Sequence, residues 1–270
     1  MVKMYLDVVA CSYKENIDFA KLLALPTYNS HKIGDIWHRK TPLDYSEWSY
    51  NSDIFETRNI DFILRSFMNS IKDKQDIFIK RLKETESELS IYVVVEKEET
   101  DSINGLINKD LLLFYASLNA SISIDGLVNE IFDTNLTIED TQYAEVSQEN
   151  NVNMSLDFNI TSNEPIRYLN KKSSELGIQN EKKENKYVCK ISTPVIKCID
   201  TDELLKYFYK QFKLDFIENT VISVTTTRNL IIYIDNGKGT PYSISFEPST
   251  INFLRRLNTD LFIDFKLSSN

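Results

Sequence analysis

The sequence lacks the compositional marks of several special classes of protein. It has only six Gly and six Pro among 270 residues, which excludes collagen-like and low-complexity chains, and its 42% of apolar residues excludes a disordered one. Its longest apolar runs, such as Ile91–Val95, are far shorter than the roughly 18 residues of a membrane-spanning helix. Asp7, Glu15 and Asp18 argue against a secretory leader. We therefore expect a globular, cytoplasmic protein with no membrane partner.

Cysteine is also scarce. The three cysteines, Cys11, Cys189 and Cys198, lie at none of the close paired spacings that metal sites use. We expect buried free thiols in a reducing compartment, because each lies in or beside a strand-like apolar segment. The sequence predicts no metal site and no cofactor.

Positive charge is missing from one long stretch. No Lys, Arg or His occurs from Asp110 to Glu164, whereas ten Asp and Glu do, so this stretch carries −10 and the rest of the chain −9 + 10 = +1. We define the acidic block as Asp125, Glu130, Asp133, Glu139, Asp140, Glu145 and Glu149. It is either a solvated linker or a patch that steers a basic protein partner to the chain. Both alternatives disfavour nucleic acid as a partner.

Two patterns from the first half return in the second. Leu89–Tyr92 recurs as Leu230–Tyr233, at an offset of 230 − 89 = 141. Phe114, Leu118-Asn119 and Ile124-Asp125 recur as Phe253, Leu257-Asn258 and Ile263-Asp264, at an offset of 253 − 114 = 139. Met4–Val8 likewise resembles Met154–Phe158. We expect two copies of one unit, with Leu118 and Leu257 as buried equivalents.

Periodicity predicts the same alternation of strands and helices in each copy. In the first, strands are expected over 3–11, 88–96 and 120–125, with one or two short ones around Ile36 and Glu47–Tyr50, and helices from Asn16 to Pro26, over 59–84 and over 108–118. In the second, strands are expected over 153–160, 187–199, 220–235 and 261–265, and helices from Asn163, around Leu204–Phe212 and from Glu247.

This order indicates an α+β fold: two tandem copies of a small mixed sheet with helices packed on one face, a ferredoxin-like type of sandwich. The expected division is a first repeat over 1–126, an acidic linker over 127–150 and a second, diverged repeat over 151–270.

Aromatic and charged residues gather in one loop-rich segment of the first repeat. We define the aromatic loop as His31, Asp35, Trp37, His38, Arg39, Trp48 and Tyr50. It is either a recognition surface for a partner or ligand, because Trp, Tyr and Arg dominate binding hot spots, or a plug in which both Trp side chains fold inward. The spacing of its two His matches no standard metal-ligand pattern, and a His–Asp pair alone does not define a catalytic site. No catalytic residue is predicted.

The first repeat resembles the bacterial domain-of-unknown-function family 4279. The resemblance covers residues 3–125 and rests on Leu23–Thr27, Gly34-Asp35, Trp48 and the helices and strands that follow, with Ala24 where the family has Gly. The second repeat, over 152–267, keeps Leu176–Ile178 but lacks the Pro-Thr, Gly-Asp and Trp motifs. The family has no established activity. Its occurrence beside bacterial toxin and conflict genes implies an immunity or inhibitor role.

Three functions stay open on this basis. The first is a non-catalytic bacterial protein that binds and occludes a toxin or defence protein. The second is a small-molecule or nucleotide-binding module, and the third is an enzyme that uses the His31 and His38 loop. Reversing charge in the acidic block should slow association with a partner if the first function holds. The sequence leaves the oligomeric state and the arrangement of the repeats open.

Overall fold

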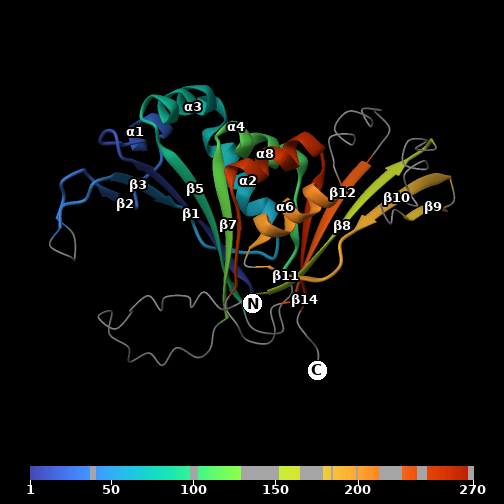
Figure 1. Cartoon of the computed structure of the whole chain (residues 1–270). Helices are drawn as coiled ribbons and strands as arrows, with labels where there is room; N and C mark the ends of the chain where they lie inside the picture. The colour runs from blue at the N-terminus through green and yellow to red at the C-terminus, as the bar shows by residue number, and fades with distance from the viewer. Residues whose placement is uncertain are drawn as a thin grey trace.

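The computed structural model of the chain shows two sheets with helices between them (Figure 1). It describes residues 1–36, 41–97, 103–128, 152–164, 179–183, 185–198, 200–212, 227–235 and 242–266.

The first half alternates strands and helices. In chain order it contains β1 (Lys3–Ser12), α1 (Ala20–Leu23), β2 (Asn29–His31), β3 (Ser46–Asn51), β4 (Phe55–Glu56), α2 (Ile60–Ile71), the 3-10 helix η1 (Lys72–Lys74), α3 (Gln75–Glu84), β5 (Glu88–Lys97), β6 (Gly105–Ile107), α4 (Lys109–Ser117) and β7 (Ala120–Val128).

The second half follows the same order. It contains β8 (Val152–Ser162), β9 (Gln179–Lys183), β10 (Lys186–Ser192), β11 (Ile196–Cys198), α6 (Thr201–Phe212), β12 (Thr227–Asp235), β13 (Tyr242–Phe246), α8 (Pro248–Leu257) and β14 (Asp260–Lys266).

Each sheet has seven strands and mixes parallel with antiparallel pairs. The first has the order β13-β7-β5-β1-β3-β2, with β4 also on β1, and the second has the order β6-β14-β12-β8-β10-β9, with β11 also on β8. The pairs β5–β7 and β12–β14 are parallel, and each is joined through a helix. The predicted α+β class with two similar mixed sheets is confirmed.

The two halves exchange one strand each. β13 belongs to the second half but pairs with β7 in the first sheet, where Phe246 lies opposite Ile122. β6 belongs to the first half but pairs with β14 in the second sheet, where Ile107 lies opposite Leu261. The two exchanges correspond to each other, since 246 − 107 = 139 and 261 − 122 = 139. Neither sheet is therefore built from one half of the chain alone.

The sequence patterns predicted neither of the exchanged strands, β6 and β13. β6 has three residues and begins with Gly105, so it is too short to show a strand period. The tight approach of β6 to β14 explains this glycine, because a Cβ at Gly105 would lie 2.2 Å from the carbonyl oxygen of Ile263.

The pairing registers also correct the alignment of the two halves. Val8 pairs with Ile91 in the first sheet, and Phe158 pairs with Leu230 in the second. Since Val8 and Phe158 correspond, Leu230 corresponds to Ile91 at an offset of 139, and not to Leu89 as the sequence match suggested. The error is two residues, which leaves each side chain on the expected face because strand side chains alternate.

The long helix predicted over 59–84 is interrupted. It consists of α2, η1 and α3, with the 3-10 turn at Lys72–Lys74. Asn59 caps α2 by accepting a hydrogen bond from the backbone N of Asp61 at 3.1 Å, as its place before the apolar stripe predicts. The sequence has no Gly or Pro at this position, and the apolar spacing continues across it, so nothing in the sequence indicates that the helix is interrupted.

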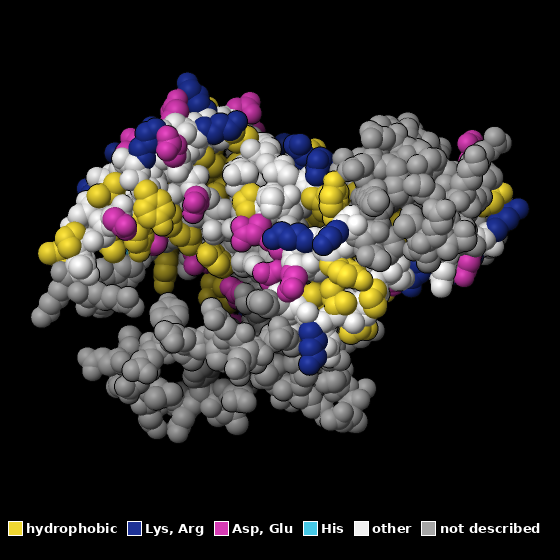
Figure 2. Space-filling view, in the orientation of Figure 1, with side chains coloured by type: hydrophobic (Ala, Val, Ile, Leu, Met, Phe, Trp, Pro, Cys, Tyr) yellow, Lys and Arg dark blue, Asp and Glu magenta, His cyan; other side chains and the backbone are white. Residues whose placement is uncertain are grey.

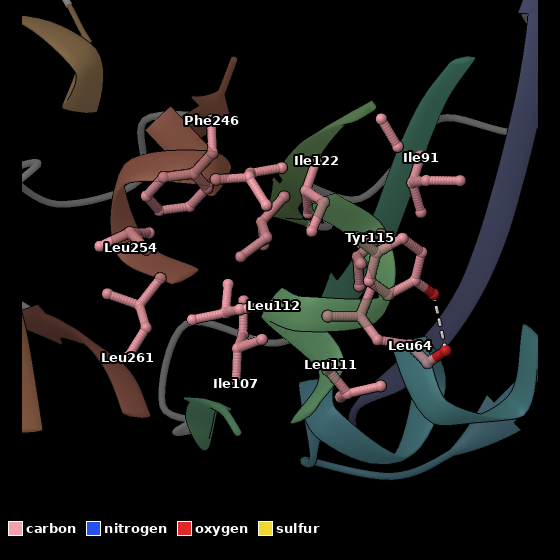
Figure 3. Close-up of a cluster of buried hydrophobic side chains, with 14 of the residues drawn as sticks. Leu64, Ile91, Ile107, Leu111, Leu112, Tyr115, Ile122, Phe246, Leu254 and Leu261 are labelled. Carbon is pink, nitrogen blue, oxygen red and sulfur yellow. Dashed lines mark hydrogen bonds between the residues drawn. The ribbon is translucent and has the colours of Figure 1, made fainter. Parts of the chain in front are cut away.

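One continuous core joins the two sheets. The helices α4 and α8 contact each other in the layer between the sheets, and side chains from both halves meet there (Figure 3). Leu112, Tyr115 and Leu254 are all at most 1% exposed. The hydroxyl of Tyr115 donates to the backbone oxygen of Leu64 at 2.7 Å, so this buried polar group is satisfied.

The repeated Leu-Asn pairs mark equivalent ends of α4 and α8. Leu118 is 4% and Leu257 is 0% exposed, which confirms that both are buried. The following residues, Asn119 and Asn258, adopt φ values of 52° and 49°. Asn tolerates this left-handed conformation, which turns the chain from each helix into the closing strand.

Candidate functional site

The strongest candidate site is the face of the first sheet that the helices do not cover. Along β1, Leu6 and Val8 point into the core, so Tyr5, Asp7 and Val9 point the other way. We define the outer acidic face by the carboxylates that the registers place on this side: Asp7, Glu47, Glu56, Glu88, Glu96 and Asp125.

Carboxylates occupy the outward rows of β1 at Lys3, Tyr5, Asp7 and Cys11, and the row of Val9 between the last two has none. Glu47 and Glu88 both lie opposite Cys11, and Asp125 lies opposite Val94. Within the described strands of this sheet, Lys3, opposite Glu96, is the one Lys or Arg at an outward position. The face therefore combines negative charge with very few cations to balance it.

Burial and repulsion perturb the groups at the centre of the face. The pKa of Asp7 is raised, first by partial burial and then by the charge of Glu47. The pKa of the Cys11 thiol is raised to about 11, by burial first and then by Glu47 and Glu88. Each shift shows that further negative charge is unfavourable here.

Two oxygen atoms on this face also lack hydrogen-bond donors. Asp7 lies opposite Asn51 in the β1–β3 register. Asp7 Oδ1 and Asn51 Oδ1 are both shielded from solvent, and no donor from the described residues reaches either atom. Such unsatisfied groups cost stability and are uncommon in a native fold, which singles out this row as a candidate functional position.

The corresponding face of the second sheet is neutralised. Asp157 takes the place of Asp7, and there Lys190 Nζ lies 2.8 Å from its carboxylate and Ser192 Oγ donates to it at 2.6 Å. Burial pushes the pKa of Asp157 upward, but the hydrogen bonds from Lys190, Ser192 and Tyr233 outweigh it and lower the pKa. The uncompensated acid is therefore a property of the first sheet.

Side-chain chemistry over the first sheet is consistent with this contrast. In Figure 2, Asp and Glu side chains lie among hydrophobic ones over the sheet that carries β1 and β5. The hydrophobic colour includes Tyr. Tyr5 and Tyr92 occupy outward positions on these two strands, where burial raises the pKa of each hydroxyl. Tyrosine is enriched in protein-binding surfaces.

The predicted acidic block is described only at Asp125, which lies on β7 and belongs to the outer acidic face. The other members, Glu130, Asp133, Glu139, Asp140, Glu145 and Glu149, lie outside the described residues.

The predicted aromatic loop divides between core and surface. Trp48 is fully buried, packs edge-on against Phe19 with ring centroids 5.6 Å apart, and donates from Nε1 to the Thr27 hydroxyl at 3.2 Å. Tyr50 is half-buried and stacks on Phe67. Because both side chains take part in packing, the inward alternative holds for Trp48.

The remaining described members of the loop make local contacts. His31 lies on β2, where its Nε2 is 3.1 Å from the side-chain amide of Asn29. Asp35 accepts a hydrogen bond from the backbone N of Lys32 at 2.7 Å, which closes a turn. Trp37, His38 and Arg39 lie outside the described residues.

Sequence reasoning missed five of the six carboxylates of the outer acidic face. The alternation of apolar residues with Tyr5, Asp7 and Val9 in β1 could have identified the outward positions. Placing Glu47, Glu88 and Glu96 on the same side required the strand order, which the sequence does not contain.

Metal and membrane sites receive no support from the described part of the chain. There, no three His, Cys, Asp or Glu residues lie close enough together to hold a metal ion. None of its helices has the length and apolar character needed to cross a membrane.

Comparison with known proteins identifies the first half. Residues 8–129 match the family described as Domain of unknown function (DUF4279), which confirms the resemblance predicted for this half. No curated protein matches the chain. A crystal structure described as that of a glycine cleavage system transcriptional repressor aligns over 85% of this chain and 97% of its own, with 7% identity and a TM-score of 0.19. So low a score supports no statement on fold or function.

Proposed function

We propose that this protein is a non-catalytic binding protein whose outer acidic face captures a basic protein partner. The observation that carries the proposal is the pair of contrasting sheet faces. Among the described residues, no cation compensates Asp7 in the way that Lys190 compensates Asp157. A basic partner would supply positive charge to this face, so binding would offset the repulsion between its carboxylates.

The proposed biological role is an immunity or conflict-system inhibitor that acts in the bacterial cytoplasm. Toxins that act on nucleic acid are typically basic, and an acidic face would raise the rate at which such a protein is captured. The family match to residues 8–129 is compatible with this role, and so are the free thiols of Cys11, Cys189 and Cys198 in a reducing compartment.

Charge reversal on the face tests the proposal. A partner would first be isolated with the wild-type protein from a lysate of the native host, identified by mass spectrometry and purified. Glu88→Lys with Glu96→Lys should then lower its association rate constant about tenfold or more at low salt and weaken the salt dependence. The matched control is Asp73→Lys with Asp76→Lys, which makes the same change in net charge on the exposed surface of η1 and α3.

The comparison between the two variants decides the outcome. A slower rate only in the Glu88 and Glu96 variant supports the outer acidic face. Equal slowing in both variants would show that net charge, and not this face, controls association. An unchanged rate in the face variant would refute the proposal.

A further inference from the structure

A groove between α6 and α8 lies away from the outer acidic face. Its volume is about 220 Å³, and its apolar wall consists of Leu205, Tyr209 and Phe253. The rings of Tyr209 and Phe253 meet edge-on with centroids 5.6 Å apart. Tyr209 is 38% exposed, whereas Leu205 and Phe253 are buried, so the groove presents an apolar surface that solvent can reach.

The polar lining of the groove is cationic or neutral. Lys206 and Arg256 contribute charge, and Ser249 and Thr250 contribute hydroxyls from the first turn of α8. On the face shown in Figure 2, Lys, Arg, Asp and Glu side chains all lie close to apolar ones in the region of α6 and α8. An apolar groove with a few polar groups of one charge is the usual composition of a small-ligand site.

The position of Lys206 on α6 has an equivalent on α2 in the first half. Asp61 accepts from the backbone N of Asn108 at 3.0 Å, and Asp202 accepts from the backbone N of Glu247 at 3.3 Å, so the two helix pairs meet in the same way. This correspondence places Lys206 where the first half has Arg65, at an offset of 206 − 65 = 141.

The charges then differ between the two halves. Arg65 forms an ion pair with Asp110, with 2.6 Å between Nη1 and Oδ2. The counterpart of Asp110 on α8 is Ser249, at an offset of 249 − 110 = 139, so α8 provides no carboxylate to Lys206. Within the described residues, no ion pair engages Lys206, and Asp202, four residues earlier on α6, interacts with it electrostatically.

We propose that this groove binds a small monocarboxylate with an apolar body. Its carboxylate would pair with Lys206 and accept a hydrogen bond from Ser249, which is the role that Asp110 fills toward Arg65 in the first half. Its apolar body would pack along Tyr209 and Phe253.

Titration calorimetry with n-octanoate as the probe tests this proposal. Octanoate should bind saturably at one site per chain. Octanamide has the same apolar body without the charge, and acetate has the charge without the body, so each should bind at least tenfold more weakly. Equal binding of octanamide or acetate, or no saturable binding of octanoate at millimolar concentration, would overturn the proposal.

Variants then locate the site. Ser249→Asp places a carboxylate beside Lys206 and should weaken octanoate binding tenfold or more, while the fold is retained because an acid is favourable in the first turn of a helix. Lys206→Gln should also weaken binding, and the matched control Lys210→Gln, on an exposed position of the same helix, should not. Unchanged affinity in both groove variants would place the octanoate elsewhere and refute the assignment.

Discussion

Truncation of Phe246 tests whether the exchanged strands join the two halves into one folding unit. Phe246 lies in the second half of the chain but is 1% exposed within the first sheet, opposite Ile122 on β7. Removing a buried Phe side chain to Ala typically costs about 3 to 5 kcal/mol. With a urea m-value of about 3 kcal/mol per M, the unfolding midpoint of Phe246→Ala should fall by roughly 1 to 2 M.

Tryptophan fluorescence makes this test selective. Both tryptophans, Trp37 and Trp48, belong to the first half, so their emission reports on the first sheet. The fluorescence transition and the far-UV circular dichroism transition of Phe246→Ala should shift together. Leu113→Ala is the control, because Leu113 is 55% exposed on α4 and its truncation should change stability by less than about 0.5 kcal/mol.

Independent halves would give another result. In that case the fluorescence transition of Phe246→Ala would stay at the wild-type urea concentration, and only a separate part of the dichroism signal would move. This outcome would refute the structural role assigned to the strand exchange.

Four further substitutions test packing and charge. Gly105→Ala should destabilise the protein by about 1 to 3 kcal/mol, because the new Cβ would collide with the carbonyl oxygen of Ile263. The same substitution should reduce hydrogen-exchange protection in β14. Unchanged protection there would contradict the close approach of β6 to β14. Tyr115→Phe should cost about 1 kcal/mol in urea unfolding, since it removes one buried hydrogen bond, and no change would show that the bond is unimportant. The pKa of Asp7 is raised, so Asp7→Asn should raise the melting temperature at pH 7, and this gain should shrink as pH falls through the raised pKa. The pKa of Asp157 is lowered, so Asp157→Asn should lower the melting temperature at pH 7. This loss should disappear as pH falls below the usual pKa range of Asp. Shifts of the same sign in the Asp7 and Asp157 variants would contradict the contrast between the sheets.

Local patterns in the sequence identified most of the elements. The alternation in β1 and the cap at Asn59 each act within a few residues, so they are visible without tertiary information. The Leu118-Asn119 and Leu257-Asn258 pairs were also informative, because one residue of each is buried and the next turns the chain.

Features that depend on pairing between distant segments could not be predicted in the same way. β6 and β13 are short, and their identity as strands comes from the partners β14 and β7 in the other half. The outer acidic face had the same limitation, because Asp7 and Glu88 come together only through the order of strands. Trp48 is a related case, since aromatic residues in a loop-rich segment can serve binding or packing and only Phe19 and Thr27 show which one applies.

The differences between the two halves are more informative about function than their similarities. The residues that face the exchanged strands are apolar in both halves, as Ile122 on β7 and Leu261 on β14 show. Both residues fill the shared core. A symmetric dimer of identical chains would carry the same outer face and the same groove twice. Joining two units in one chain removes that constraint, so one sheet can keep an uncompensated Asp7 while the other pairs its Asp157 with a cation. The same freedom allows an ion pair between Arg65 and Asp110 in one half, whereas no ion pair engages Lys206 among the described residues of the other half. The acidic and the cationic binding surfaces that we propose therefore lie at positions where the two halves differ.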